Sequence, residues 1–309
     1  MLKKKNSILI PVYNNSLTLN VLYKRILLTI KSIKKFNYQI IFVNDNSKDN
    51  SETLLNKISI KDKNVTVIHL SKNFGQAAAI YAGFDFVKGD YVICFDADLQ
   101  DPPELIKTIV KEFKKKNDIV IASRKSSQEN IFRTITSKIT HSFIKSLVPE
   151  YPSNGFNYWA VTKKMFKLIK RNEDSSKAIQ LKILDLGFKI KIIYYDRSKR
   201  IHSKSQYSFF KLTNNFVSLF FSSSTAPIRF GFFIAILIAL LGLINLGSVF
   251  VSYLNGEMPF NGWAPLVFFI IFFGSANLFF VCIVGEYVIR LSKFLDSKQS
   301  YYIKKIINK

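Results

Sequence analysis

Cysteine and histidine are scarce in this chain of 309 residues. The two cysteines, Cys94 and Cys282, lie in separate apolar segments, so we expect buried small side chains rather than a disulfide. The three histidines show no spacing typical of a zinc site. A disulfide framework and a structural zinc are therefore not expected.

Acidic residues are also few, 21 against 45 lysines and arginines, which gives a net charge of +24. Two long stretches, 230–256 and 258–285, contain no charged residue at all. Each exceeds the roughly 20 residues that a helix needs to cross a bilayer, so they predict a transmembrane hairpin with spans at about 230–253 and 263–286. A pair of buried core helices is the alternative. Basic charge beside such stretches favours anionic membrane lipids as partners over nucleic acid.

The basic residues that flank these stretches predict their orientation. Arg229 precedes the first, while Arg290 and several lysines follow the second. By the positive-inside rule, both chain ends face the cytoplasm, and we expect an integral protein of the inner or plasma membrane. The predicted parts are a cytosolic catalytic domain, an amphipathic juxtamembrane helix, the two spans and a basic cytosolic tail, at residues 1–206, 207–228, 229–290 and 291–309 respectively.

Short apolar runs alternate with helical patterns in the first 125 residues. The strands are predicted at residues 7–12, 38–43, 65–70, 91–95 and 118–122, and helices at 19–36, 76–87 and 102–116. Such alternation is typical of an α/β fold with a mostly parallel sheet.

One predicted strand ends on two carboxylates. The apolar run 91–95 is followed by Asp96 and Asp98. Ligands of open α/β sheets bind at the carboxyl ends of strands, and carboxylate oxygens suit Mg²⁺ or Mn²⁺. The pair predicts a metal that holds a diphosphate, whereas the alternative is a solvated acidic turn.

Four motifs in order resemble those of family 2 glycosyltransferases, particularly the membrane-bound polyprenyl-phosphate sugar transferases. They are Ile-Pro-Val-Tyr-Asn at 10–14, Val-Asn-Asp-Asn-Ser at 43–47, Leu-Ser-Lys-Asn-Phe-Gly-Gln at 70–76 and Asp-Ala-Asp-Leu-Gln-Asp-Pro-Pro-Glu at 96–104. The resemblance implies a Rossmann-like GT-A fold, a nucleotide-diphospho-sugar donor and Mg²⁺ or Mn²⁺. It also implies an inverting transfer to a polyprenyl phosphate, such as undecaprenyl phosphate, at the cytoplasmic face of the membrane.

The resemblance assigns roles to residues of this chain. Those expected at the nucleotide-sugar are Pro11, Tyr13, Asn15, Asp45 and Asp96. Those expected at the metal are Asp96, Asp98 and Gln100, with both aspartates as catalytic residues. Those expected at the acceptor phosphate are Arg124, Arg133, Ser137, Arg200 and Ser205.

Several positions depart from the family pattern. Asn15 stands where glutamate is usual, Asn44 where the first aspartate of a pair is usual, and Asn157 where relatives often carry aspartate. Near the predicted membrane segment, Ser203 replaces a glycine and Gln206 a frequent lysine. A shifted donor preference, a different acceptor and a degenerate, membrane-tethered scaffold that only binds a nucleotide-sugar all stay open. The sugar, the nucleotide and the oligomeric state are also open, although related enzymes often associate through their membrane helices.

Overall fold

The computed structural model describes residues 5–34, 37–125, 152, 156–171, 179–196, 236, 237, 240, 244, 247, 251, 254–256, 264–296 and 301–308. The chain forms two compact units. The sheet unit comprises residues 1–210 and 299–309, and the second unit comprises residues 211–298.

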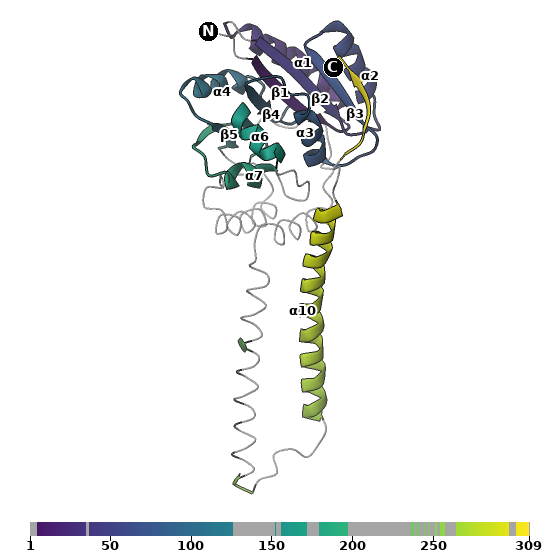
Figure 1. Ribbon diagram of the computed structural model, residues 1–309, viewed down its shortest axis with the longest axis vertical. Helices are drawn as coiled ribbons and strands as arrows, with labels where there is room; N and C mark the ends of the chain where they lie inside the picture. The colour runs from purple at the N-terminus through teal and green to yellow at the C-terminus, as the bar shows by residue number, and fades with distance from the viewer. Residues whose placement is uncertain are drawn as a thin grey trace. The chain divides into compact units, whose positions relative to one another are not determined.

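An eight-stranded sheet forms the centre of the sheet unit, in the order β7-β5-β6-β4-β1-β2-β3-β8 (Figure 1). The strands are β1 Lys5–Val12, β2 Asn37–Asn44, β3 Val65–Leu70, β4 Tyr91–Cys94, β5 Ile119–Arg124, β6 Tyr158–Thr162, β7 Ile190–Tyr195 and β8 Ile303–Ile307. The pairs β1–β2, β1–β4, β2–β3 and β5–β7 are parallel, whereas β6 and β8 run antiparallel to their neighbours. The predicted mostly parallel α/β sheet is confirmed.

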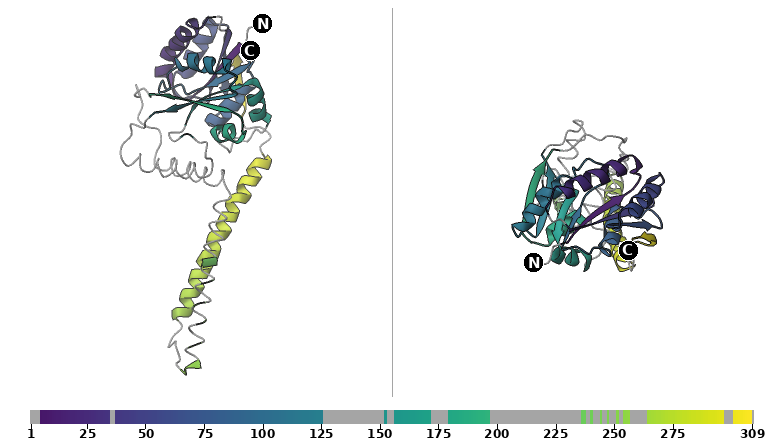
Figure 2. Two further views of the ribbon diagram at one scale, coloured as in Figure 1. Left: turned by 90° about the vertical axis from the view of Figure 1, so that its left-hand side faces the viewer. Right: turned by 90° about the horizontal axis from the view of Figure 1, so that it is seen from above.

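Helices cover both faces of this sheet (Figure 2). They are α1 Ser16–Lys31, α2 Ser51–Lys61, α3 Gln76–Phe84, α4 Leu105–Lys114, α6 Lys163–Arg171 and α7 Ile179–Asp185. Successive strand side chains point to opposite faces, so Ile8 and Ile10 pack with α1, α2 and α4, while Leu9 packs with α3, α6 and α7. The result is a three-layer sandwich with a buried core on each side of the sheet.

The approach of α3 to the sheet depends on a glycine. A side chain at Gly83 would place its Cβ 2.2 Å from Leu9 Cδ1. Both residues lie in the fully packed layer between α3 and β1. The small residue therefore sets how closely the helix that follows the 70–76 motif packs on the sheet.

The predicted elements before residue 125 are all present, with shifted ends. Helix α1 begins at Ser16 and ends at Lys31, rather than spanning 19–36. Helix α4 begins at Leu105, because Pro102 and Pro103 form a turn whose carbonyls accept the N–H groups of Leu105 and Ile106. Strands β6, β7 and β8 and helices α6 and α7 were not predicted.

The predicted basic tail, residues 291–309, contains strand β8. It pairs antiparallel with β3, and Ile306 lies opposite Ile68. Two of its apolar side chains, Ile303 and Ile307, pack against the core clusters. The chain therefore returns to the sheet after the predicted membrane segment.

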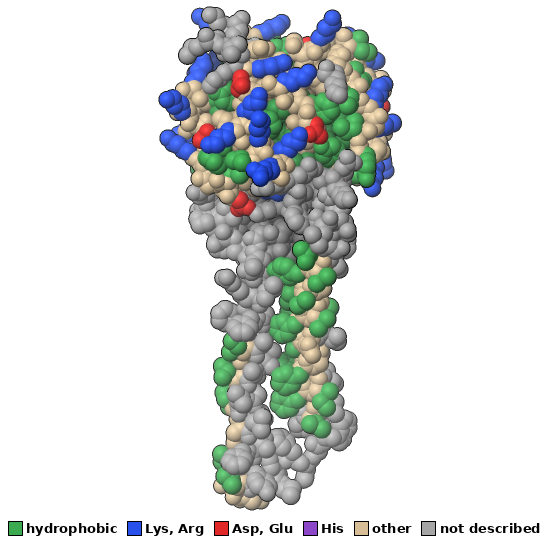
Figure 3. Space-filling view, in the orientation of Figure 1, with side chains coloured by type: hydrophobic (Ala, Val, Ile, Leu, Met, Phe, Trp, Pro, Cys, Tyr) green, Lys and Arg blue, Asp and Glu red, His purple; other side chains and the backbone are tan. Residues whose placement is uncertain are grey.

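The second unit contains helix α10, Ala264–Asp296, which begins near the predicted start of the second span and continues ten residues beyond 286. Apolar side chains are exposed along it (Figure 3). Leu266 and Phe279 are among them. Cys94 is buried, as predicted. Cys282, which was also predicted to be buried, is exposed on α10. Its predicted burial depended on a membrane span, and no protein contact among the described residues buries it. Within the described residues, no helix combines the length and apolar character needed to cross a bilayer. The hairpin stays a prediction, and residues 207–228 lie outside the described part.

Candidate active site

The candidate site lies where β1, β2, β3 and β4 end. These strands are neighbours, and all four run parallel, so their carboxyl ends meet at one edge of the sheet. Antiparallel β6 begins at the same edge, because Trp159 lies opposite Cys94 at the end of β4. Ligands of open α/β sheets bind at such an edge. Every quoted motif begins or ends there.

Hydrogen bonds join the loop after β1 to the loop after β2. The N–H of Asn14 donates to Ser47 Oγ at 3.0 Å, and the N–H of Lys48 donates to Asn14 Oδ1 at 2.8 Å. The N–H of Asn15 donates to Ser51 Oγ at 3.1 Å. Asn14 adopts a left-handed φ of 55°, which asparagine tolerates better than most residues. The two loops therefore form one cross-linked surface.

Three residues predicted at the nucleotide belong to the first of these loops or to the strand before it. Pro11 is buried within β1, opposite Val43. Tyr13 is half-buried, and its N–H donates to Asn15 Oδ1 at 3.1 Å. The structure thus places Tyr13 and Asn15 together at the sheet edge.

Asp45 holds the loop between β3 and α3, residues 71–75. Its Oδ1 accepts the N–H of Phe74 and its Oδ2 the N–H of Gly75, each at 2.8 Å. The side chain is buried, which raises its pKa, while the two N–H groups act in the opposite direction. Gly75 adopts φ 93°, a conformation that favours glycine. Asp45 therefore orders this loop, and its contact with a nucleotide stays a prediction.

Asn44 belongs to a buried polar chain behind the loop. Its Nδ2 lies 3.0 Å from His69 Nδ1, and His69 Nε2 lies 2.8 Å from Asn56 Oδ1. The Asn56 oxygen can only accept, so Nε2 carries the hydrogen and Nδ1 accepts from Asn44. Burial and the nearby lysines of β8 lower the pKa of His69, although Glu52 opposes them. His69 is therefore held neutral.

Asp96 lies two residues after β4 and receives two side-chain amides. Gln76 Nε2, at the start of α3, donates to its Oδ1 at 2.6 Å, and Asn157 Nδ2, just before β6, donates to its Oδ2 at 2.8 Å. Burial, Asp101 and Asp98 raise the pKa of Asp96 to about 7, against the opposing effects of Asn157 and Arg124. Negative charge is thus concentrated around this carboxyl group.

Asp98 and Gln100 follow in a tight loop. Asp98 Oδ1 accepts the N–H of Gln100 at 3.0 Å. Leu99 between them has a φ of 61°, which is unusual for a bulky residue and indicates local strain. Gln100 Oε1 is buried and has no hydrogen-bond partner among the described residues. Asp98 lies near enough to Asp96 to raise its pKa.

These residues fit a divalent cation that a substrate helps to hold. No group of three or more His, Cys, Asp or Glu side chains in the described ranges could hold a metal ion alone. Mg²⁺, however, commonly uses one or two carboxylates together with waters and substrate phosphates. Burial and the repulsion from Asp101 and Asp98 raise the pKa of Asp96, and a bound cation relieves that repulsion. The orphaned oxygen of Gln100 is a suitable hard ligand.

Arg124 ends β5 beside a second buried carboxylate. Its Nη2 lies 4.0 Å from Asp101 Oδ1, which also accepts the hydroxyl hydrogen of Tyr195 from the end of β7. Burial opposes the charge of Arg124, but Asp101 and Tyr195 outweigh burial and raise its pKa. Burial and Asp101 in turn raise the pKa of Tyr195. Arg124 is therefore held as a cation at the same sheet edge.

Sequence reasoning missed several residues of this site. Gln76 and Asp101 belong to quoted motifs but received no role, and Tyr195 ends a strand that was not predicted. Gln180, from α7, donates to Asn157 Oδ1 at 3.2 Å. The remaining predicted acceptor residues lie outside the described part, so their roles stay predictions; they are Arg133, Ser137, Arg200 and Ser205.

Comparison with known proteins places the chain among glycosyltransferases. The chain is 32% identical over 319 residues to the undecaprenyl-phosphate 4-deoxy-4-formamido-L-arabinose transferase of Photorhabdus laumondii, covering 98% of this chain and 94% of the relative. It is 27% identical over 303 residues to the bactoprenol glucosyl transferase of Shigella phage SfII, covering 97% of this chain and 98% of the relative. The solved structure of mannosyl-3-phosphoglycerate synthase from Rubrobacter xylanophilus has a similar fold, with a TM-score of 0.50, 16% identity, and coverage of 71% of this chain and 72% of that one.

The fold is accordingly GT-A-like. Residues 7–172, more than half of the chain, match the sequence profile described as glycosyl transferase family 2. This match includes Asp45, Asp96, Asp98 and Arg124. The chain belongs to glycosyl transferase family 2.

Proposed function

We propose that this protein transfers one sugar from a nucleotide-diphospho-sugar to a polyprenyl phosphate at the cytoplasmic face of a membrane, with inversion at the sugar carbon. Two relatives that align over nearly their whole length are named for transfer to bactoprenol or undecaprenyl phosphate. The observation that carries the proposal is the concentration of carboxylates at the end of β4, where burial, Asp101 and Asp98 raise the pKa of Asp96. Such a site suits a metal-bound diphosphate.

The donor side is built from residues that are already ordered. Gln76 and Asn157 fix both oxygens of the Asp96 carboxylate, and Asp98 follows in the adjoining loop. When bound, Mg²⁺ or Mn²⁺ would neutralise the charge that grows on the leaving nucleoside diphosphate. Tyr13 and Asn15 are suited to the nucleotide because the loop that carries them is cross-linked to its neighbour. Little reorganisation is then needed on donor binding.

The acceptor side calls for positioning more than for a general base. A lipid phosphate is already an anionic oxygen nucleophile at neutral pH, so the protein must chiefly bind and orient it. Arginine suits this task because its planar guanidinium can bind two phosphate oxygens at once. Asp101 and Tyr195 hold Arg124 at the sheet edge. We assign the acceptor phosphate to Arg124 together with Arg133, Ser137, Arg200 and Ser205.

The membrane part of the proposal rests on the sequence. The uncharged stretches 230–256 and 258–285 support two spans, with the amphipathic segment 207–228 on the membrane surface. Lysine and arginine side chains are spread over the visible face of the sheet unit, which suits anionic headgroups (Figure 3). We propose that both chain ends lie in the cytoplasm and that copies associate through the membrane helices.

A panel assay tests the reaction. Purified protein in detergent receives undecaprenyl phosphate, Mn²⁺ or Mg²⁺, and radiolabelled UDP- and GDP-sugars in turn, and label is followed into the organic phase. We expect metal-dependent label from one donor, and none with the Asp98→Asn variant. Nucleotide binding without label from any donor would contradict the proposed reaction and favour the scaffold that the departures at Asn15, Asn44 and Asn157 left open.

A further inference from the structure

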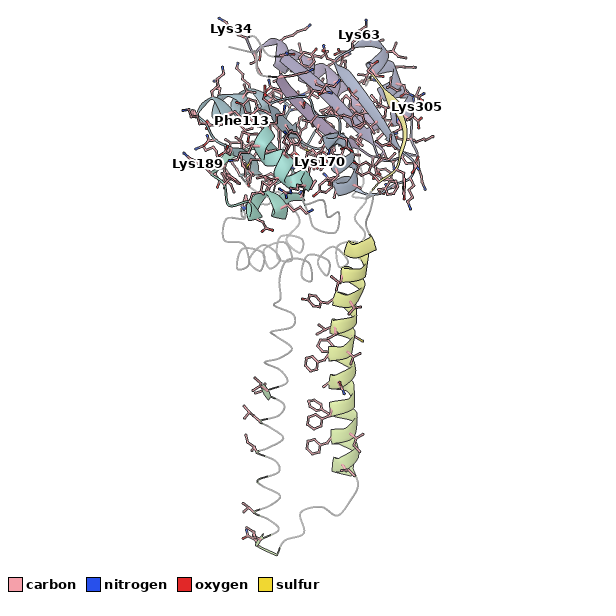
Figure 4. The ribbon with its side chains drawn as sticks, viewed as in Figure 1. Lys34, Lys63, Phe113, Lys170, Lys189 and Lys305 are labelled. Carbon is pink, nitrogen blue, oxygen red and sulfur yellow. The ribbon has the colours of Figure 1, made fainter. Side chains whose placement is uncertain are left out.

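The C-terminal segment, residues 301–308, is fastened along the whole length of β3. Its strand β8 pairs with β3 from Val67, opposite Ile307, to Leu70, opposite Ile303. The register shifts between His69 and Leu70. Because of this irregularity, Ile303 and Ile307 pack on opposite faces of the sheet although they are four residues apart. Lys305 lies on this strand at the edge of the sheet (Figure 4).

Asn308 anchors the far end of the segment. Its Nδ2 donates to the carbonyls of Ser59 and Val65, the latter at 3.2 Å. Its own carbonyl accepts the hydroxyl hydrogen of Thr66 at 2.8 Å. Asn308 adopts a left-handed φ of 55°, which turns the backbone at the end of β8. This anchor fixes the register of the strand.

Asp85 anchors the near end. This residue caps α3 and accepts the Tyr301 hydroxyl on Oδ2 and the Lys170 ammonium, from α6, on Oδ1. The segment therefore reaches past the end of β3 to the helices on one face of the sheet. Tyr302, between this anchor and the strand, is held at a fixed place.

Tyr302 contacts the loop of residues 71–75. Its carbonyl accepts the N–H of Ser71 at 2.9 Å, which continues the β3–β8 ladder into the loop. Its ring lies 6.1 Å from the ring of Phe74, tilted by 48°. Lys72 Nζ also lies 5.1 Å from the centre of the Phe74 ring. Phe74 therefore contacts both a cation and the C-terminal segment.

The same loop carries two groups of the candidate site. The N–H groups of Phe74 and Gly75 bind Asp45, and the next residue, Gln76, donates to Asp96. A displacement of Phe74 would therefore disturb the hydrogen bonds to the Asp45 carboxylate and to the Asp96 carboxylate. The C-terminal segment limits such a displacement from outside the loop, in addition to Asp45.

We propose that Tyr302 is a positioning residue for the donor site, and that the C-terminal segment is a clamp that holds the 71–75 loop in its nucleotide-binding arrangement. The inference rests on the proposed function, because it takes the loop to contact a nucleotide-sugar. Tyr302 acts through Phe74 and touches neither substrate nor metal. Its effect is therefore on donor affinity rather than on the chemical step.

Two measurements on the full-length protein in detergent test the clamp. The first is hydrogen–deuterium exchange of the amides of Phe74 and Gly75 without nucleotide. The second is titration with UDP and with GDP, each with Mn²⁺, followed by calorimetry. The variants are Tyr302→Ala, Tyr302→Phe and the matched control Lys304→Ala, an exposed side chain on the same strand.

In Tyr302→Ala, the amides of Phe74 and Gly75 should exchange faster than in the wild type. The variant should also bind the preferred nucleotide about two- to tenfold more weakly, the range expected for one lost aromatic pair. Tyr302→Phe should restore both values, and Lys304→Ala should match the wild type. Since the ring pair is partly exposed, the melting temperature of Tyr302→Ala should stay close to that of the wild type. Should that variant nevertheless unfold, Phe74→Leu removes the same contact from the other side and is held to the same two results.

Unchanged exchange, or faster exchange with unchanged nucleotide affinity, would overturn the proposal. Failure of the proposed function looks different. If the chain binds no nucleotide-sugar, the wild type binds neither UDP nor GDP, and the exchange measurement still decides whether Tyr302 clamps the loop. If it binds nucleotide but transfers no sugar, both measurements still test the clamp.

Discussion

At pH 8, replacing Asn157 by aspartate should make Asp96 and the new carboxyl group hold one proton between them, whereas wild-type Asp96 has largely lost its proton. In the structure, Asn157 Nδ2 donates to Asp96 Oδ2 at 2.8 Å. Its Oδ1 meanwhile accepts from Gln180 at 3.2 Å, which orients the amide. In the Asn157→Asp variant the new side chain can keep the Gln180 contact, but it turns a carboxylate oxygen toward Asp96. The variant thus exchanges a hydrogen bond for a repulsion with little change in shape.

The magnitudes decide the outcome. A hydrogen bond to a charged group contributes about 1.5–3 kcal/mol, and two like charges about 4 Å apart repel by roughly 4 kcal/mol at an effective dielectric constant of about 20. A pKa shifts by one unit for each roughly 1.4 kcal/mol, and the pKa of Asp96 is already about 7. Either effect alone moves it well above neutrality. At pH 8, Asp96 and the carboxyl group introduced by Asn157→Asp should therefore share one proton, whereas wild-type Asp96 keeps about a tenth of one.

The number of protons released on Mn²⁺ binding measures this difference in bound protons directly. Bound metal displaces ligand protons, and calorimetry in buffers of different ionisation enthalpy counts them. At pH 8 without nucleotide, the wild type should release about a tenth of a proton and Asn157→Asp close to one. Asn157→Ala, which removes this hydrogen bond without adding charge, should release an amount between those of the wild type and Asn157→Asp, because loss of the hydrogen bond alone raises the pKa of Asp96. Equal release from Asn157→Asp and the wild type would refute the electrostatic account of the site.

Three further changes probe other parts of the site. Asp98→Asn should abolish sugar transfer while the circular dichroism stays unchanged, and near-normal turnover would contradict a metal role. Tyr195→Phe should raise the KM for undecaprenyl phosphate several-fold, because Arg124 loses a fixed neighbour; an unaltered KM would count against the acceptor role. The lowered pKa of His69 means that the unfolded chain takes up a proton first, so stability is full above the ordinary value of 6.5 and is lost as pH falls below it. The urea midpoint of unfolding should be lower at pH 5.5 than at pH 7.5 in the wild type, and should fall less in His69→Gln. An equal fall in both proteins would contradict this role of His69.

Periodicity predicted the first half of the sheet because its strands are short apolar runs bounded by turn residues. Strands β1 to β5 have this form, and each was found within a few residues of its predicted place. The later strands carry another pattern. Residues 303–307 read Ile-Lys-Lys-Ile-Ile, which resembles a basic tail, and lysine on an edge strand is a common protection against aggregation. Only pairing with β3 makes this segment a strand, and a local pattern does not show that.

The acidic motif predicted the position of the site, but not the residues that support it. Gln76 is 20 residues from its partner Asp96, and Tyr195 is 94 residues from its partner Asp101. These contacts arise because β3, β4 and β7 all end at the same edge of the sheet. Side-chain chemistry in a single segment does not reveal such pairs, whereas the strand order does.

The asparagines that depart from the family pattern are best judged by their neighbours. Asn44 uses both ends of its amide: Nδ2 donates to neutral His69, and Oδ1 accepts the N–H of Ser47 at 3.1 Å. Asn157 does the same between Asp96 and Gln180. A carboxylate offers only acceptors, so at either position it would lose the donor half of the arrangement.

If the site had lost its function, the residues around Asn44 would not be expected to fit an amide better than a carboxylate. Instead, His69 presents an acceptor to Asn44, and its other ring nitrogen is satisfied by Asn56, which fixes the tautomer that Asn44 requires. An aspartate at position 44 would instead favour a protonated His69, a charge that burial and the adjoining lysines of β8 oppose. The residues around the amide therefore match it, which favours adaptation of a working donor site over loss of function.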